Sequence, residues 1–274
     1  MLKPNNYNNK IMNINHKKIV ITGAASGIGE SLLKNLLQHE NVEIVATDLN
    51  PISNDLPSNV HQHQGDIASV TGIEDLFEFA LQKMGKIDLF IANAGFAYYE
   101  KNEHEDWARI NSIYQCNTFS PIYCSHKMAR LNKGQEYGVL ITASFMGIYS
   151  LPGYSLYSST KAALISWSDA YRREKDDKGH IMLLCPVATK TQFFNTNAPV
   201  PWPTQTSQQV AQAAIKGIQK NKYKIFPSKL SILTLALNRV FPLVMPIYKA
   251  IETNKFKQWL NKRELDPKQA VPPI

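Results

Sequence analysis

Short apolar runs alternate with longer amphipathic stretches from residue 18 to residue 226. This alternation is typical of a parallel β-sheet covered by helices on both faces. The apolar runs predict strands at residues 18–22, 42–48, 60–65, 87–93, 139–143, 181–185 and 223–226. The amphipathic stretches predict helices at residues 27–39, 71–84, 103–131, 154–175 and 207–219, the second opening with a capping box at Thr71 and Glu74. The chain is therefore expected to form a single α/β domain with a Rossmann-like, doubly wound parallel sheet of about seven strands.

Three segments lie outside this pattern. Residues 1–16 are polar and contain no sustained apolar run, which predicts a flexible N-terminal arm that is neither a secretory signal nor a membrane span. Within the predicted domain, residues 17–227, the stretch 192–206 carries prolines and aromatic residues without periodicity and is expected to form a long lid loop. Residues 228–274 form a basic, partly apolar C-terminal extension.

The net charge of +8 is unevenly distributed. Residues 19–215 hold 14 Lys and Arg against 19 Asp and Glu, whereas residues 216–274 hold 12 against 3. Within this basic segment, the apolar stretch at residues 228–250 is too interrupted by charged residues and prolines to span a bilayer. Three alternatives remain for it: a cover over a substrate pocket, an interface with a second subunit, or peripheral contact with an anionic membrane. A nucleic-acid partner is not expected, because no base-reading motif accompanies the lysines.

The three cysteines, Cys116, Cys124 and Cys185, have no metal-ligand spacing and cannot all pair with one another. This pattern suits a reducing compartment. We therefore expect no metal site and a cytoplasmic protein, with peripheral membrane association as an alternative.

A glycine-rich turn, TGAASGIG from Thr22 to Gly29, joins the first predicted strand to the first predicted helix. Glycines at such a turn let the backbone approach a pyrophosphate, which the N–H groups at the helix N-terminus then bind. Asp48 ends the second predicted strand, 19 residues after Gly29. A carboxylate there accepts hydrogen bonds from a ribose diol and repels a 2′-phosphate, so NAD is expected in preference to NADP, which is not excluded.

Tyr157 and Lys161 lie four residues apart in a predicted helix. Their side chains are therefore expected on one face of the helix, about one turn apart. An ammonium beside a phenol favours the phenolate, so the pair predicts a tyrosine with a lowered pKa that exchanges a proton with a substrate.

Taken in order, these motifs resemble the short-chain dehydrogenase/reductase family, in the members that carry a TGxxxGxG turn and a YxxxK active site. The resemblance covers roughly residues 17–226. It rests on the turn from Thr22 to Gly29, Asp66-Ile67, Asn93-Ala94-Gly95, Asn117, Ser144, Tyr157 to Lys161, Pro186 and Thr191.

The resemblance implies that Tyr157, Lys161, Ser144 and Asn117 are catalytic. Tyr157 would transfer the hydroxyl proton, Ser144 would bind the substrate oxygen, Lys161 would bind the nicotinamide ribose, and Asn117 would hold a water molecule that links Lys161 to solvent. The implied cofactor-binding residues are Gly23, Ser26, Gly27, Ile28, Gly29, Asp48, Asp66, Ile67, Asn93, Ala94, Gly95, Tyr157, Lys161, Pro186, Thr189 and Thr191.

The expected substrate is a secondary alcohol or ketone of apolar or lipid-like character, and the expected assembly is a homodimer or homotetramer. Ser144, Tyr154 and Phe193 are expected to contact the substrate, within an apolar pocket formed by segments that hold Phe145, Met146, Tyr149, Tyr154, Phe193, Phe194 and Trp202. Two residues depart from the family pattern: Val187 stands where a glycine usually follows the proline, and Ala92 where a second asparagine is common. The alternative is a non-catalytic dinucleotide-binding or scaffold protein that keeps the fold.

Overall fold

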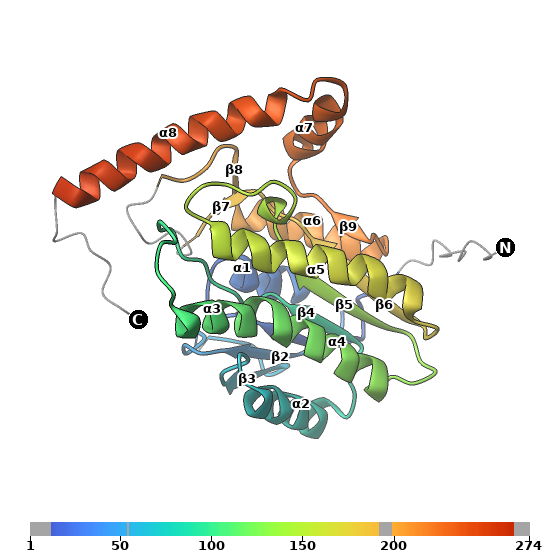
Figure 1. Ribbon diagram of the computed structural model, residues 1–274. Helices are drawn as coiled ribbons and strands as arrows, with labels where there is room; N and C mark the ends of the chain where they lie inside the picture. The colour runs from blue at the N-terminus through green and yellow to red at the C-terminus, as the bar shows by residue number, and fades with distance from the viewer. Residues whose placement is uncertain (1–11, 54, 192–198, 266–274) are drawn as a thin grey trace.

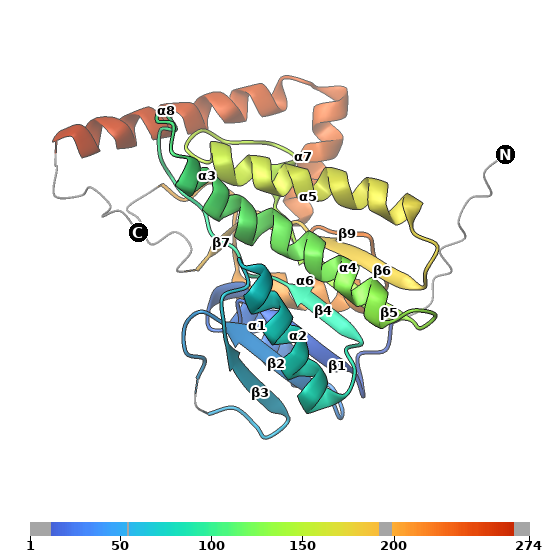
Figure 2. The ribbon, with the colours of Figure 1, turned by 60° about the horizontal axis from the view of Figure 1, so that its bottom comes forward.

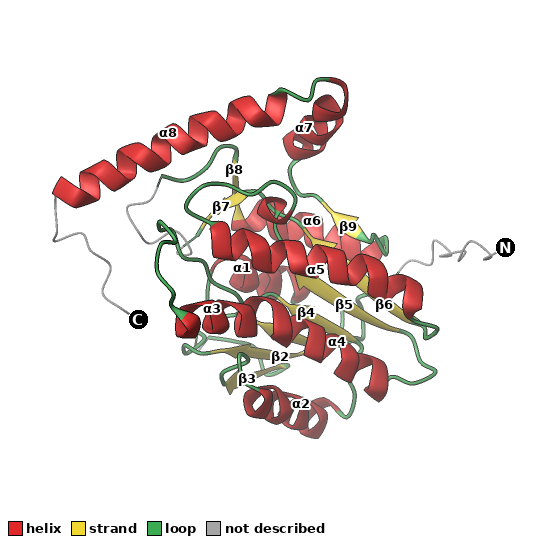
Figure 3. Ribbon diagram, viewed as in Figure 1, coloured by secondary structure: helices red, strands yellow, loops and turns green. Residues whose placement is uncertain are grey.

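A computed structural model describes residues 12–53, 55–191 and 199–265, which form a parallel sheet between two layers of helices (Figures 1 and 3). The seven-stranded sheet has the order β3-β2-β1-β4-β5-β6-β9, and every neighbouring pair is parallel. Its strands are β1 (Lys18–Thr22), β2 (Glu43–Asp48), β3 (Val60–Gln64), β4 (Leu89–Ala92), β5 (Tyr137–Thr142), β6 (Gly179–Leu184) and β9 (Lys224–Ile225). The predicted doubly wound α/β fold is confirmed.

The two helical layers have separate apolar cores because the central strands are buried on both faces. In β1, Ile19 and Ile21 pack on one side with α1 (Gly27–Leu36) and α6 (Ser207–Gln219), whereas Val20 packs on the other side. That second side is covered by α2 (Val70–Met84), α4 (Ser120–Leu131) and α5 (Ser155–Glu174) (Figure 2). Alternate side chains of one strand thus enter opposite layers, as the period of an extended chain requires.

Two predicted helix starts were wrong. The first turn of α2 is capped by Ser69, whose Oγ accepts a hydrogen bond of 3.0 Å from Gly72 N, so Thr71 lies inside the helix rather than at its cap. The predicted helix at 103–131 begins only at Trp107, where Asp106 is the N-cap. It also divides into α3 (Trp107–Tyr114), the π-helical turn η1 (Gln115–Phe119) and α4. A π turn of this kind is frequent at functional sites.

Residues 12–16, expected to belong to a flexible arm, instead pack against the domain. Ile14 is buried in the core, and Met12 N donates a hydrogen bond to the carbonyl oxygen of Gln219. Two apolar side chains at alternate positions, those of Met12 and Ile14, pack against the core and hold this stretch in place.

Short elements follow the sixth strand. β7 (Ala188–Lys190) pairs in parallel with β8 (Thr204–Thr206) in a separate two-stranded sheet, and a 3₁₀ turn, η2 (Phe145–Gly147), follows β5. β8 falls inside the predicted lid loop 192–206, of which residues 192–198 lie outside the described residues.

The C-terminal extension forms two helices, α7 (Lys229–Val240) and α8 (Val244–Leu265), at one end of the molecule (Figures 1 and 2). Within the described part of the chain, no single helix is long and apolar enough to cross a bilayer. Among the helices of the described residues, α7 and α8 up to Lys262 reach that length and hydropathy only when taken together, and they are bent by 120° relative to one another.

Candidate active site

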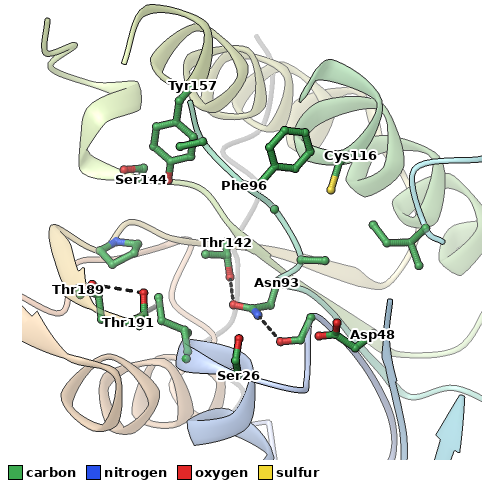
Figure 4. A pocket seen from close by; sticks show the side chains of 18 of the residues that line it. Ser26, Asp48, Asn93, Phe96, Cys116, Thr142, Ser144, Tyr157, Thr189 and Thr191 are labelled. Carbon is green, nitrogen blue, oxygen red and sulfur yellow. Dashed lines mark hydrogen bonds between the residues drawn. The ribbon is translucent and has the colours of Figure 1, made fainter. Parts of the chain in front are cut away.

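A cavity of about 490 Å³ opens at the carboxyl ends of the central strands (Figure 4). Its walls come from the segments that follow β1, β2, β3, β4, β5 and β6. Carboxyl ends of parallel strands on both sides of a change in winding direction form the usual ligand site of this architecture. The sheet order shows that change between β1 and β4.

The glycine-rich turn is held tightly against the end of β4. Gly23 has φ of +68°, and a Cβ at that position would lie 2.8 Å from Ala94 Cα. A Cβ on Gly29 would lie 1.8 Å from the carbonyl oxygen of Gly23. Both glycines therefore allow the chain to pass from β1 into α1 within this turn.

The N-terminus of α1 borders the cavity. Ser26 is the N-cap residue, and its side chain makes no capping hydrogen bond. Ser26, Gly27 and Ile28 line the cavity, so the first N–H groups of the helix are available to an anion in it. The positive end of the helix dipole adds to this attraction.

Asp48 lies at the other end of the cavity from Tyr157 (Figure 4). Its Oδ2 accepts a hydrogen bond of 3.0 Å from Ala25 N, and its Oδ1 accepts one of 3.0 Å from Asn50 N. The carboxylate is thus fixed by the glycine-rich turn and by the loop after β2, while it stays half-buried at the cavity wall.

Asn93 joins the ends of three strands. Its Nδ2 donates to the carbonyl oxygens of Thr22 and Gly23, each at 3.2 Å, and its Oδ1 accepts a hydrogen bond of 3.1 Å from Thr142 Oγ1. Thr22 Oγ1 in turn accepts hydrogen bonds from the backbone N–H groups of Asn93 and Ala94. This network holds the floor of the cavity between β1, β4 and β5.

Ser144 and Tyr157 lie close together on one wall of the cavity (Figure 4), and a side-chain hydrogen bond with Ser144 acts to lower the pKa of the Tyr157 phenol. Ser144 comes from the turn after β5, and its Oγ also accepts a hydrogen bond of 3.1 Å from Met146 N. Tyr157 lies in the first turn of α5. Both side chains are buried, with 5% and 8% of their surfaces exposed.

Lys161 lies one turn further along α5 and lines the same cavity. Its Nζ is 5.7 Å from the centroid of the Tyr157 ring and donates a hydrogen bond of 2.8 Å to the carbonyl oxygen of Thr142. The predicted arrangement of phenol and amine on one helical face is therefore present.

The predicted lowering of the phenol pKa is not found in the protein alone. Burial raises the pKa of Tyr157 to about 12, an effect that the hydrogen bond with Ser144 only partly offsets. Burial also lowers the pKa of Lys161 to about 8. Removal from water disfavours the charged form of both groups, and it is the largest cause of both shifts.

Asn117 lies behind the cavity wall, in the π turn η1. Its Oδ1 accepts a hydrogen bond of 3.0 Å from Phe96 N, and its Nδ2 donates to the Phe96 carbonyl oxygen at 2.8 Å and to Thr160 Oγ1 at 3.2 Å. The amide therefore fixes the loop after β4 against α5. A Cβ on Gly95 would lie 2.8 Å from Asn117 Oδ1 and 3.4 Å from Lys161 Nζ, which places both polar groups beside that glycine.

The segment after β6 forms the remaining wall. Pro186, Val187, Ala188, Thr189 and Thr191 line the cavity. Thr189 Oγ1 donates a hydrogen bond of 3.0 Å to the Val187 carbonyl oxygen, and Thr191 Oγ1 donates one of 3.4 Å to the Thr189 carbonyl oxygen. Val187, at the position where the family usually has glycine, is almost fully buried and adds an apolar surface there.

Comparison with known proteins agrees with this arrangement. The profile of the family described as short chain dehydrogenase matches residues 17–200. The chain belongs to the short-chain dehydrogenase family. It is therefore an oxidoreductase of that family, and the resemblance seen in its motifs is confirmed.

A curated relative of this short-chain dehydrogenase is a 3-oxoacyl-[acyl-carrier-protein] reductase of Thermotoga maritima, 26% identical over 174 residues, which cover 60% of this chain and 70% of the relative. A solved short-chain dehydrogenase/reductase from Burkholderia phymatum in complex with NAD has a TM-score of 0.73 and 17% identity, covering 84% of this chain and 95% of that one. Another from Burkholderia cenocepacia, in complex with NADP, has a TM-score of 0.73 and 19% identity, with coverages of 85% and 98%. At these identities, the two structures show a shared fold.

Most of the site residues expected for a short-chain dehydrogenase lie together around the cavity. Those that line it are Gly23, Ser26, Gly27, Ile28, Asp48, Asp66, Ile67, Asn93, Ala94, Gly95, Ser144, Tyr157, Lys161, Pro186, Thr189 and Thr191. Gly29 and Asn117 do not line it, because Gly29 serves the turn and Asn117 lies behind Phe96 and Gly95. Phe193 lies outside the described residues.

Tyr154, expected to contact the substrate, does not line the cavity. Its ring packs against Tyr99 at 4.7 Å between centroids and against Tyr157 at 6.3 Å. It is buried behind Tyr157 because it precedes the first turn of α5, where the helical periodicity that directs Tyr157 into the cavity does not yet apply.

Several lining residues were missed by the sequence analysis. Thr142 binds both Lys161 and Asn93, and its position as the last residue of β5 was the signal that could have found it. The others are Thr47, Leu49, Asn50, Gly65, Phe96, Ala97, Cys116, Val187 and Ala188. Burial raises the pKa of the Cys116 thiol to about 11. Among the described residues, no group of three or more His, Cys, Asp or Glu side chains is placed to hold a metal ion.

Proposed function

We propose that this short-chain dehydrogenase interconverts a secondary alcohol and a ketone of apolar character with NAD as the hydride carrier. The observation that carries the proposal is the hydrogen-bonded pair of Ser144 and Tyr157, with Lys161 lining the same cavity. The pair offers a hydroxyl that binds a substrate oxygen and a phenol that exchanges its proton.

The residues of the cavity fit a dinucleotide. The uncapped N-terminus of α1, with Ser26, Gly27 and Ile28, would hold the pyrophosphate, and Asp48 would accept hydrogen bonds from the adenosine ribose. Asp66 and Ile67 line the part of the cavity after β3, beside the expected adenine position. When bound, the nicotinamide ring accepts or supplies the hydride. The carboxylate of Asp48 would repel a 2′-phosphate, which favours NAD over NADP.

Proton transfer falls to Tyr157. In the oxidation direction, the alcohol loses its hydroxyl proton to the phenolate and a hydride from its carbinol carbon, and in the reduction direction the phenol returns the proton to the substrate oxygen. Ser144 Oγ would hold that oxygen. Burial places the pKa of the Tyr157 phenol near 12. A positive charge brought into the cavity would lower that pKa and so favour the phenolate that takes the proton of the alcohol.

The wall of the cavity next to Tyr157 favours an apolar substrate. Phe96, Met146 and Val187 line it close to the Ser144 and Tyr157 pair (Figure 4 shows Phe96). The relative from Thermotoga maritima is named as a reductase of 3-oxoacyl groups, which combine a ketone with an acyl chain. Both observations support a ketone or secondary alcohol attached to an apolar body.

The test is turnover with NAD or NADH against steroids, sugars, acyl chains and short alcohols, with Tyr157→Phe as the variant. We expect activity on an apolar member of the panel, lowered about 10²- to 10⁴-fold by the substitution, with unchanged NADH binding. The alternative is a dinucleotide-binding or scaffold protein without turnover. Wild type and Tyr157→Phe that bind NADH equally and are equally inactive across the panel would establish that alternative.

Assembly as a homodimer or homotetramer and a cytoplasmic location remain predictions from the sequence. Sedimentation of the full chain and fractionation of the cells that produce it would test them.

A further inference from the structure

We propose that the tip of the α7–α8 hairpin docks this protein on an anionic membrane surface. The tip is defined as residues 237–251. The proposal concerns the exposed side chains of the tip, which do not line the cavity, and it does not depend on the proposed reaction.

The tip gathers apolar side chains that the protein itself does not cover. Six of the 17 large exposed apolar side chains among the described residues lie in the tip, and three more lie just before it, at residues 230–233. Val240, Phe241, Leu243 and Ile247 are 60–69% exposed. Exposed apolar groups at this density in a short segment mark an interaction surface rather than ordinary surface composition.

The two faces of α8 have different roles. On one face, Met245, Glu252 and Trp259 are buried, and the rings of Trp259 and Phe256 pack on Tyr99 at 4.6 and 5.4 Å between centroids. The rest of the helix surface carries exposed Ile247 and Ile251 near the tip and exposed Lys257 and Lys262 further along. The buried face anchors the helix to the domain, and the exposed surface is therefore presented to a partner.

The charges of residues 228–262 indicate which kind of partner this surface binds. Residues 228–262 contain six Lys and Arg and a single acidic residue, Glu252. Glu252 is buried and pairs with Lys255 at 2.7 Å, so every exposed charge of this segment is positive. Arg239 and Lys249 lie within the tip, and an apolar tip surrounded by basic side chains matches the interface of a bilayer with anionic lipids.

A second copy of the chain is a poorer occupant. Two tips placed against one another would bring Arg239 and Lys249 of each copy close to the like charges of the other. This segment offers no exposed acidic side chain to compensate them. The 120° bend between α7 and α8 also makes the tip convex, a shape suited to shallow insertion between lipid headgroups.

The experiment measures co-sedimentation of the full chain with phosphatidylcholine vesicles, with or without phosphatidylglycerol. We expect at least about tenfold tighter binding to the anionic vesicles, weakened at high salt. The triple variant Phe241→Ser, Leu243→Ser, Ile247→Ser and the triple variant Arg239→Gln, Lys249→Gln, Lys257→Gln should each weaken binding by more than about tenfold.

Matched controls are Val70→Ser with Leu131→Ser for exposed apolar side chains, and Lys83→Gln, Lys101→Gln, Lys133→Gln for exposed lysines elsewhere. These should leave vesicle binding unchanged, and thermal unfolding of every variant is compared with wild type. Absence of wild-type binding to anionic vesicles, or equal binding by wild type and the tip variants when all are folded, would overturn the proposal. So would a concentration-dependent dimer that the apolar triple variant abolishes, together with no vesicle binding, because the occupant is then a second copy.

Discussion

Lys161 Nζ donates a hydrogen bond of 2.8 Å to the carbonyl oxygen of Thr142, so a buried amine on α5 is tied to the end of β5. Only 3% of the lysine surface is exposed, and its pKa falls from 10.5 to about 8 because burial disfavours the ammonium. The cavity therefore contains a group whose charge reduces the stability of the folded protein at neutral pH.

Replacement of this lysine should change how stability depends on pH. Below about pH 8, the folded protein carries the full cost of the buried ammonium. Between about pH 8 and 10.5, only the unfolded chain holds the proton, so this group makes the free energy of unfolding rise with pH. The variant Lys161→Met lacks the amine and therefore lacks this rise of the unfolding free energy with pH. Relative to this variant, wild type should gain on the order of 2 kcal/mol between pH 7 and pH 10, measured by urea unfolding.

The control for this pH dependence is Lys83→Met, which removes an exposed lysine. It should follow the wild-type curve at both pH values. A constant difference between wild type and Lys161→Met across this range would contradict the lowered pKa of the amine.

Asp48 should determine the choice between NAD and NADP. We expect wild type to bind NADH at least about tenfold more tightly than NADPH, because the carboxylate repels the 2′-phosphate. Asp48→Asn removes the charge and keeps an oxygen that can accept a hydrogen bond from Ala25 N. It should therefore narrow the difference between the NADH and NADPH affinities without loosening the turn. Asp48→Ala should narrow this difference and weaken the binding of both cofactors. Fluorescence titration measures the six affinities, and tighter binding of NADPH by wild type would refute the assignment.

Asn117 should act on the site through Phe96. Its amide satisfies both backbone groups of that cavity residue, and its removal leaves a part-buried donor and a part-buried acceptor without these partners. Asn117→Ala should therefore cost about 2–4 kcal/mol of unfolding free energy and weaken NADH binding.

Thr160→Val provides the comparison for Asn117. It removes the third hydrogen bond of the amide and leaves the two to Phe96 in place. This variant should cost about 1 kcal/mol and change NADH affinity little. Equal effects of the two substitutions on NADH binding would show that Phe96 is positioned by other contacts.

Local patterns were sufficient to predict the sheet and the main site. Strand β1 was predicted at its observed bounds because its side chains are buried on both faces and the following glycines mark its end. The spacing of Tyr157 and Lys161 predicted a shared face because an α-helix has a fixed periodicity. These features depend on residues close together in the chain.

The features that were missed depend on contacts between distant segments. Burial of the Tyr157 phenol, which reverses the predicted direction of its pKa shift, results from the packing of several elements around it. The π turn that holds Asn117 has no distinct spacing of apolar residues that would distinguish it from α3 and α4 in the sequence. Tyr99 gave no signal in the sequence, although it joins the loop after β4 to α8.

The contact between Tyr99 and α8 leads to a final prediction. Trp259 is 8% exposed, and its ring lies 4.6 Å from that of Tyr99, so this pair is an apolar contact that joins α8 to the domain. Trp259→Ala should release the end of α8 locally, because this anchor is lost while the sheet and its cores keep their contacts. Trypsin should then cleave after Lys255, Lys257 and Lys262 at least about tenfold faster than in wild type, with little change in the melting temperature of the domain. Ile251→Ala removes an exposed side chain from the same helix and should leave the cleavage rate unchanged. Equal cleavage rates in all three proteins would show that α8 is held by contacts other than those of its aromatic face.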